Sequence, residues 1–234
     1  MSGSFDSEAT VSPDQGFALF SGMSLVDCTS IVSAAHERNF SRQQTIFVEG
    51  DLVQHVPLLV SGSAKVKQSG QIGGKVILRL CGPGELLSCC SVGRHCSTAQ
   101  ALESSKALIW DAANFEALWE RFPMLLRNTE RILSEHLENL EERFREISTK
   151  NVALRLGNEL VRFSLKHVGH DVNGEVEIRL SREELADLVG STLFTVSRIL
   201  CQWERRGIVA GRRREAVSVR NLQALIELSK GYDS

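Results

Sequence analysis

Six arginines lie close together near the C-terminus of this 234-residue chain. From Arg198 to Arg214 they are accompanied by one glutamate, so the segment carries a local charge of +5 while the whole chain carries −2. Guanidinium groups at this density attract a polyanion, and the phosphate backbone of a nucleic acid is a common one. The alternative is a solvated surface without a partner. The choice between the two depends on the secondary structure that holds these arginines.

Two short helices joined by a tight turn are predicted just before and within this segment. The first begins with a capping box, in which the Ser181 hydroxyl accepts a hydrogen bond from the Glu184 amide and the Glu184 side chain reaches back. Gly190 ends it, because glycine adopts a positive φ at the lowest cost. Ser191 or Thr192 caps the second helix. The pattern indicates a helix-turn-helix, although any amphipathic helix pair joined by glycine shares it.

The second helix has an outer face that suits DNA. Its inner face consists of Val196, Ile199, Leu200 and Trp203. Such a helix fits the major groove, about 12 Å wide, where an arginine donates two hydrogen bonds to guanine O6 and N7. Nearby hydroxyls, helix-end amides and an arginine-rich turn suit phosphates. The predicted DNA contacts are Ser181, Arg182, Ser191, Thr192, Leu193, Phe194, Ser197, Arg198, Arg212 and Arg213, with Arg214 beside them.

Short Val- and Ile-rich runs, punctuated by glycines, fill the region from Phe40 to Trp110. They lie at residues 45–48, 56–60, 64–67, 75–80 and 107–110. Strands at this spacing are typical of an antiparallel sandwich or barrel, so we expect a small β-roll. Ahead of it, residues 17–38 have the spacing of short helices, and residues 1–16 the composition of a flexible tail.

A long amphipathic helix follows the β-roll. Apolar residues recur every seven positions, and two more occupy the alternate positions of the same stripe. We expect this stripe to be a dimer seam, although a helix packed along its own β-domain also produces a heptad-like stripe. The predicted seam consists of Leu126, Leu133, Leu137, Leu140, Phe144 and Ile147.

The remaining elements follow the order of a winged helix-turn-helix. A second amphipathic helix, a hairpin at Asn173-Gly174, the helix pair, a β-wing and a last helix succeed one another. We therefore predict an α+β chain in four parts. These are a tail at 1–16, an effector-sensing β-roll at 17–121, a dimerisation helix at 122–149 and a DNA-binding winged helix-turn-helix at 150–234.

Several protein classes are disfavoured by composition and motifs. The chain has no apolar run near the roughly 18 residues of a spanning helix and no signal-peptide pattern, which predicts a cytoplasmic protein without membrane contact. Six scattered cysteines suit reduced thiols better than a disulfide framework. The G-x-S-x-G, H-E-x-x-H and G-x-x-x-x-G-K-[ST] motifs are missing, so we expect no enzyme.

The segment L-S-R-E-E-L-A-D-L-V-G-S-T-L-F-T-V-S-R-I-L at residues 180–200 resembles the Crp-Fnr superfamily of transcription regulators. In the N-terminal half, G-D-L-V-Q-H-V-P-L-L-V-S-G, C-G-P-G-E-L-L and S-T-A-Q-A-L-E support the resemblance, which extends from about Phe17 to the end. It implies a jelly roll of the cyclic-nucleotide-binding type and a homodimer on near-palindromic double-stranded DNA, with RNA polymerase as a further partner of an activator. A different hypothesis is an effector-binding module that regulates a protein partner and has a degenerate DNA-binding domain.

One residue of the recognition helix departs from the family pattern. The family commonly has glutamate where this chain has Phe194, and that glutamate accepts a hydrogen bond from cytosine N4. A phenylalanine ring packs on a thymine methyl instead. The half-site is therefore expected to differ from TGTGA or TTGAT at that position and to keep the guanine read by Arg198.

The resemblance also places the effector pocket, at Gly84, Glu85, Leu86, Arg94, His95 and Cys96. In the cyclic-nucleotide branch a Gly-Glu-x-Leu turn binds the ribose, and an Arg-Ser pair ten residues beyond the Glu clamps the phosphate. Here His95 and Cys96 stand at that pair, and a neutral imidazole does not replace a charged guanidinium. Leu140 and Glu141 stand where that branch has hydroxyls. Cyclic AMP is therefore disfavoured.

Other sensing chemistries are weighed in the same way. An iron–sulfur cluster of the family type is disfavoured, because Cys28 is the only N-terminal cysteine and Leu108 stands near the position of the later ligand. Thiol redox or metal chemistry remains open at Cys89, Cys90 and Cys96, as does haem held by His55, His95 or His136. The alternative is that these cysteines and histidines are structural.

Overall fold

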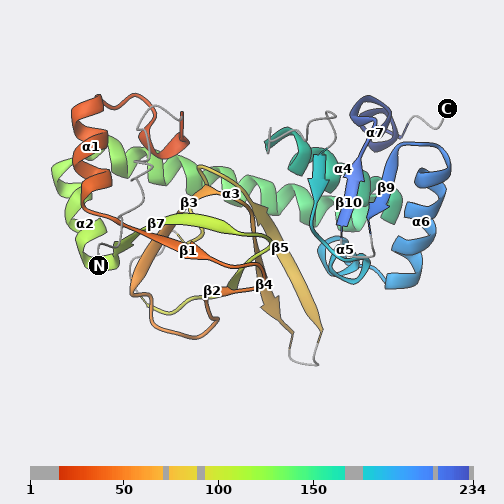
Figure 1. The fold of residues 1–234 in the computed structure, drawn as a ribbon, viewed down its shortest axis with the longest axis horizontal. Helices are drawn as coiled ribbons and strands as arrows, with labels where there is room; N and C mark the ends of the chain where they lie inside the picture. The colour runs from red at the N-terminus through yellow and green to blue at the C-terminus, as the bar shows by residue number, and fades with distance from the viewer. Residues whose placement is uncertain (1–15, 71–73, 89–92, 167–175, 213–215, 232–234) are drawn as a thin grey trace, which may run out of the picture.

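The computed structural model describes residues 16–70, 74–88, 93–166, 176–212 and 216–231. A β-rich domain and a C-terminal domain lie at opposite ends of the molecule, and one long helix, α3 (Pro123–Thr149), runs along both (Figure 1). The predicted flexible tail lies almost entirely outside the described residues.

Two antiparallel sheets build the β-domain. One has the order β1-β7-β3 (His36–Phe40, Ser105–Asp111 and His55–Ser61), and the other β2-β6-β4-β5 (Thr45–Phe47, Thr98–Ala101, Ala64–Ser69 and Lys75–Cys81). Trp110, Leu58 and Leu108 are buried in its main core. Because the Val- and Ile-rich runs alternate with turn glycines, the chain reverses often enough to form this roll.

The N-terminal prediction was partly wrong. Helical structure is limited to η1 (Ala18–Phe20) and α1 (Leu25–Ser33), and His36–Phe40 is the strand β1. Only Phe40 of this strand is buried, so its sequence lacks the alternation that marks a strand. The strand β6 was also missing from the predicted set.

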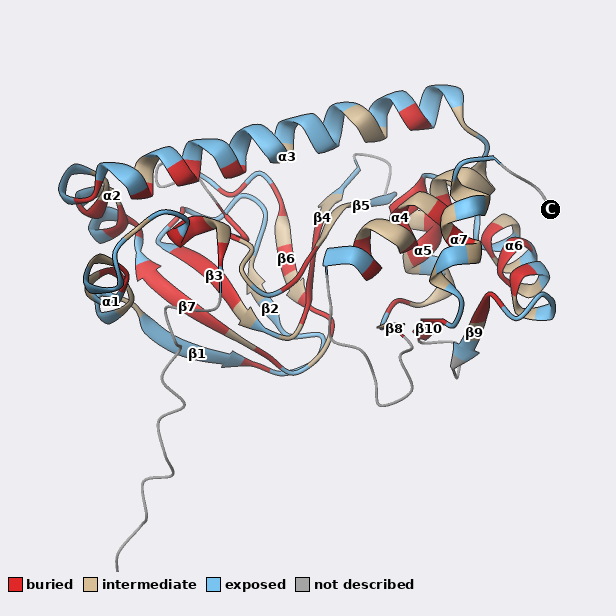
Figure 2. Cartoon of the chain, turned by 90° about the horizontal axis from the view of Figure 1, so that it is seen from above, coloured by how far each residue is buried: buried red, intermediate tan, exposed pale blue. Residues whose placement is uncertain are grey.

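Helices α2 (Ala112–Arg121) and α3 follow the roll directly. The Asp111 side chain accepts hydrogen bonds from the first amides of α2, and Pro123 occupies the first turn of α3, where its missing N–H costs nothing. At 27 residues, α3 is roughly 40 Å long. One face packs on the β-domain through Leu125 and Ile132, while the face turned away is exposed along most of its length (Figure 2).

The C-terminal domain combines helices with a small sheet. Its helices are α4 (Val152–Lys166), α5 (Arg182–Val189), α6 (Leu193–Arg205) and α7 (Leu222–Ser229), and its sheet has the order β8-β10-β9 (Val176–Ile178, Ala216–Val219 and Val209–Arg212). Strands β9 and β10 form the predicted wing. The predicted Asn173-Gly174 turn lies outside the described residues. Within the part of the chain that is described, every helix is too short or too polar to cross a membrane.

Candidate functional site

The turn between α5 and α6 is built as the sequence predicts. Ser181 Oγ accepts from the Glu184 amide at 3.1 Å, and the Ser181 amide donates to Glu184 Oε2 at 2.8 Å. Gly190 ends α5 with φ 63° in the left-handed region. Of the two candidate caps for α6 the structure uses Thr192, whose hydroxyl accepts from the Thr195 amide.

Helix α6 has one buried face and one exposed face. Val196, Ile199, Leu200 and Trp203 are buried, as predicted. Phe194 is 78% exposed and Leu193 50%, and Arg198 is exposed beside them, while Ser197 is partly buried. An exposed phenylalanine on a polar surface has no packing role in the chain itself, so this face is available to a partner.

The candidate phosphate-binding side chains differ in their exposure and in whether they already have hydrogen-bond partners within the domain. The Arg182 guanidinium donates to Glu204 Oε1 at 3.0 Å and to Cys201 Sγ at 3.6 Å, so it is already engaged within the domain. Thr192 is exposed and Ser191 partly buried, both at the start of α6. Arg212 ends β9, and Arg213 and Arg214 lie outside the described residues.

The stripe predicted as a dimer seam lies on the exposed face of α3. Leu137 is 59% exposed and Phe144 73%, and Leu133, Leu140 and Ile147 are also exposed. Leu126, near the start of the helix, is only partly exposed. The opposite face of α3 carries the packing on the β-domain, so that packing does not account for the exposed stripe, and the dimer seam stays a prediction.

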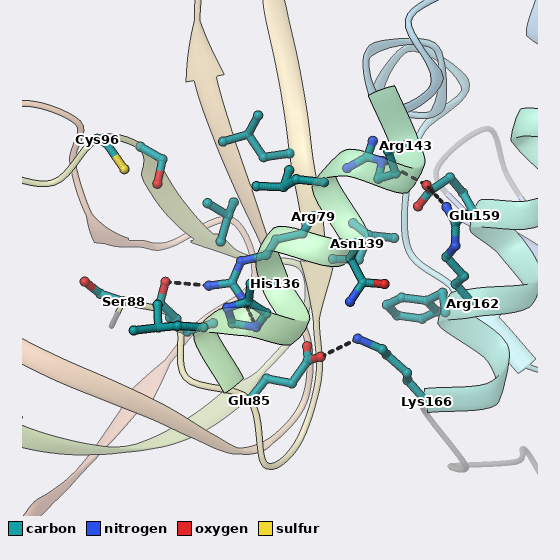
Figure 3. Close-up of a pocket in the computed structure, with 18 of the residues that line it drawn as sticks. Arg79, Glu85, Ser88, Cys96, His136, Asn139, Arg143, Glu159, Arg162 and Lys166 are labelled. Carbon is teal, nitrogen blue, oxygen red and sulfur yellow. Dashed lines mark hydrogen bonds and ion pairs between the residues drawn. The ribbon is translucent and has the colours of Figure 1, made fainter. Parts of the chain in front are cut away.

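A cavity of about 300 Å³ lies where the β-domain, α3 and α4 meet (Figure 3). Of the six predicted pocket residues, Glu85, His95 and Cys96 line it. Gly84 instead packs against Phe17, and Leu86 is fully buried. Arg94 lines a separate groove, which His95 also lines, and donates to the Gly50 carbonyl at 2.6 Å.

Arg79 and His136 meet inside the cavity. The Arg79 guanidinium donates to His136 Nε2 at 3.1 Å and to the carbonyls of Leu86 and Leu87 at 2.9 Å. Burial and the neighbouring guanidinium lower the pKa of His136 to about 4, so its imidazole is neutral near pH 7.

A salt bridge beside this pair connects the β-domain to α4. Lys166 Nζ lies 2.9 Å from Glu85 Oε1. Burial raises the pKa of Glu85, but Lys166 and the Gly82 amide outweigh it, so the pKa is lower than usual and Glu85 is ionised. The contact therefore joins two full charges across the cavity.

The other end of the cavity holds a network of arginines and glutamates. Arg143 Nε lies 2.9 Å from Glu159 Oε1, and Arg162 contacts Glu159 at 2.7 Å and Glu146 at 2.6 Å. Arg143 also donates to the carbonyls of Ile77 and Leu188. Arg143 therefore bridges α3, the β-domain and the C-terminal domain.

Sequence reasoning missed Arg79, Arg143, Arg162 and Lys166 as cavity residues. For α3 a signal existed: Ile132, His136, Asn139, Arg143 and Glu146 recur at spacings of three and four, a second stripe beside the apolar one. The stripe is mostly polar, and polar stripes usually face solvent. Its partners lie far away in sequence, which the pattern does not reveal.

The thiols and imidazoles proposed for sensing are dispersed. Cys89 and Cys90 lie outside the described residues, and Cys96 is exposed at the cavity. The His95 ring stacks on Phe47 at 4.0 Å between centroids, and His55 lines the separate groove. Among the described residues no three side chains of the metal-binding types come together. Metal, haem and redox sensing stay untested hypotheses.

Known proteins resemble both halves of the chain. Residues 37–122 match the family described as a cyclic nucleotide-binding domain, and residues 154–228 match the Crp-like helix-turn-helix domain. A cyclic AMP receptor protein from Thermus thermophilus is 26% identical over 198 residues, which cover 83% of this chain and 89% of that protein. An anaerobic regulatory protein from Pasteurella multocida is 24% identical over 196 residues, 82% of this chain and 71% of that one.

The fold is shared with solved structures as well. FixK2 from Bradyrhizobium japonicum has a TM-score of 0.73 at 22% identity, covering 83% of this chain and 96% of that one. The predicted α+β fold, with a β-roll, a long helix and a C-terminal helix-turn-helix bearing a small sheet, is confirmed.

Proposed function

The chain belongs to the Crp-Fnr family of DNA-binding transcription regulators with an effector-binding domain, which are not enzymes, and on this premise we propose how it works. It acts as a homodimer on a near-palindromic site in double-stranded DNA. A signal received in the β-domain sets its affinity for that site. Its place of action is the cytoplasm, where bacterial DNA and RNA polymerase are.

The outer face of α6 is the observation that carries this proposal. Phe194 and Arg198 project from a helix whose opposite face is buried, and a capped helix packs behind it. In the major groove Arg198 reads guanine, and Phe194 packs on a thymine methyl. Hydroxyls at Ser181, Ser191 and Thr192 and the open amides at the start of α6 contact the DNA backbone. Leu193, Ser197 and the arginines at 212 and 213 contact the backbone and the flanking bases, and Arg182 does so with the guanidinium donors that Glu204 leaves open.

The exposed stripe of α3 gives the dimer. Five large apolar side chains are exposed there at heptad positions, and full burial of each contributes about 1.5–3 kcal/mol. A parallel second copy covers them by the same stripe, since a two-fold interface is self-complementary. Two recognition helices then face successive turns of one side of the duplex, which requires a near-palindromic site.

The signal enters at the cavity between the β-domain, α3 and α4. Leu133 and Leu140 line this cavity and also belong to the exposed stripe. A ligand there therefore touches the dimer helix directly and shifts the balance between two arrangements of the DNA-binding domains. His95 and Cys96 in place of the Arg-Ser pair argue against cyclic AMP as this ligand.

Arg198→Ala tests the DNA-reading role. We first select the preferred site from random duplexes, which is expected to keep the guanine and to depart from TGTGA at the Phe194 position. Fluorescence anisotropy then compares this site with random competitor. Arg198→Ala is expected to lose at least about tenfold of the specific affinity, since a bidentate contact contributes roughly 1–3 kcal/mol in each half-site, and to keep salt-sensitive non-specific binding.

Arg38→Ala is the matched control, because it removes the same charge from an exposed strand of the β-domain. Its specific affinity is expected to stay unchanged. A wild-type protein that shows no preference for any duplex over random competitor would contradict the proposal and favour a module that acts on a protein partner.

A further inference from the structure

The cavity described above is built for a ligand with a large apolar part. Its volume of about 300 Å³ is at the lower end for small-molecule sites. Both the β-domain and the DNA-binding side supply apolar walls. They include Leu78 and Leu80 of the β-domain, Leu133 and Leu140 of α3, and Phe163 of α4.

The charged side chains of the cavity are not balanced. Four cationic side chains and two carboxylates line it, while His136 is neutral near pH 7. At one end Arg143 and Arg162 pair with Glu159 and with Glu146 behind it, and Lys150, which does not line the cavity, also contacts Glu146. Both arginines of that end are therefore paired with carboxylates, and the other end has to be considered by itself.

At that other end two cations share one carboxylate. Lys166 pairs with Glu85, whereas the hydrogen-bond partners of Arg79 among the described residues are neutral, namely two carbonyls and His136. Arg79, Glu85 and Lys166 all lie close enough to His136 to affect its titration. Figure 3 shows the Arg79–His136 contact and the Glu85–Lys166 pair lining the same cavity. This end of the cavity therefore carries one more positive than negative charge.

We propose that the cavity binds a small amphipathic organic anion, such as an aromatic or branched carboxylate, with its anionic group between Arg79 and Lys166 and its apolar body against Leu78, Leu140 and Phe163. This inference rests on the proposed function and names the ligand class of its sensing site. The anion supplies the missing charge, and it competes with Glu85 for Lys166. Because Lys166 belongs to α4, the ligand acts directly on the contact between sensor and DNA-binding domain.

Two naphthalene probes test the ligand class on the full-length protein. 8-Anilinonaphthalene-1-sulfonate is an apolar anion, and N-phenyl-1-naphthylamine is its neutral relative. Fluorescence titration is expected to show saturable binding of both, with the anion at least about tenfold tighter, since charge-assisted contacts in a half-buried site favour it. Equal affinity for the two probes, or no saturable binding of either, would overturn the proposal.

Lys166→Met locates the anionic group. This side chain is half exposed, so the variant is expected to fold, which its circular dichroism checks. It is expected to bind the sulfonate about tenfold more weakly and the neutral probe unchanged. Lys106→Met, which breaks the separate Lys106–Glu37 pair of the β-domain, is expected to change neither. A sulfonate affinity that is the same in Lys166→Met and wild type sinks the assignment.

A second variant tests the apolar part and separates this proposal from the previous one. Leu78→Trp fills the cavity and is expected to weaken both probes. Arg198→Ala, by contrast, is expected to keep wild-type probe binding while it loses the DNA site. If the wild-type protein prefers its DNA site but does not distinguish the two probes, only the ligand class is refuted. If it distinguishes the probes but prefers no DNA site, only the DNA-binding function is refuted.

Discussion

Arg79 sets the protonation state of His136. A guanidinium only donates hydrogen bonds, so His136 Nε2 has to accept, and the ring is held in the neutral form with its proton on Nδ1. Burial is the larger cause of its low pKa and Arg79 the second. The unfolded chain binds this proton below about pH 6.5, whereas the folded chain does so only near pH 4.

This difference predicts a pH-dependent stability. Above about pH 6.5 both states leave His136 neutral, and as the pH falls toward 4 the unfolded state gains a proton that the folded state does not, so stability is lost in that window. His136→Gln keeps an acceptor for Arg79 and does not titrate. Between about pH 7 and about pH 4.5 both proteins are expected to lose free energy of unfolding, as measured with urea. The loss is expected to be smaller in the variant, by on the order of 1–2 kcal/mol.

The comparison between the two proteins isolates His136, because Glu85, Glu184 and His95 titrate in both. Parallel stability curves for wild type and His136→Gln would show that the imidazole is not held neutral. A ligand anion at Arg79 is expected to raise the pKa of His136, which NMR titration of the ring protons measures.

Residues whose partners are local were predictable, and residues whose partners are distant were not. The capping box, the Gly190 turn and the inner face of α6 follow from chemistry within four residues, and the structure has them as predicted. Arg143 donates to backbone carbonyls 66 and 45 positions away, which leave no trace in a side-chain pattern. Arg94 was assigned to the effector cavity because sequence position does not reveal that its guanidinium bonds to the Gly50 carbonyl in the neighbouring groove.

At the scale of elements, α3 has two working faces. The face with Leu125, Asn128 and Ile132 is held by the β-domain, and Asn128 donates to the carbonyls of Leu19 and Ser21. Its heptad stripe is exposed. Apolar spacing is a strong sequence signal and made this stripe visible, while β1 was missed because a mostly exposed edge strand has no such signal.

The seam predicts a change of oligomeric state. Leu137→Glu places a carboxylate in the centre of the stripe, and in a dimer it faces its own copy, so two charges would have to be buried together. We expect the variant to dissociate into monomers at concentrations where the wild type is a dimer, as measured by sedimentation equilibrium.

Leu165→Glu is the matched control, because Leu165 on α4 is 58% exposed, as Leu137 is 59% exposed, but lies outside the stripe. It is expected to leave the dimer intact. If both variants remain dimeric, the chain dimerises through another surface. If the wild type itself is a monomer, the proposed homodimer is wrong.

At the scale of the whole molecule, the DNA-binding domain rests on the sensor. Helix α5 packs against β5, and Ile77 of that strand is buried in the same apolar cluster as the C-terminal core. Lys65 of β4 forms a salt bridge with Glu184, whose other oxygen accepts from the Ser181 amide. Burial raises the pKa of Glu184, but the hydrogen bonds from Lys65 and Ser181 lower it further, so the carboxylate is ionised. One side chain thus caps the first helix of the DNA-reading pair and joins that pair to the sensor.

Lys65→Met separates these two roles. Methionine has a similar length and is compatible with a position that is 5% exposed, and the capping box keeps its own hydrogen bonds. Glu184 then faces the sensor without its counter-charge, and breaking one partner of a buried pair costs about 3–5 kcal/mol, an upper figure here because Glu184 retains 21% exposure. The domain is therefore expected to release from the sensor, and amide hydrogens of α5 and β5 to exchange at least several-fold faster in hydrogen-exchange mass spectrometry. Lys106→Met, which breaks a pair within the β-domain, is expected to leave these rates unchanged.

As the pH falls, protonation of Glu184 removes the unpaired charge, so the difference in exchange rates between Lys65→Met and wild type is expected to narrow. Unchanged exchange in Lys65→Met would mean that the apolar contact at Ile77 alone holds the two domains together, and that a ligand at Lys166 has to act on that contact instead.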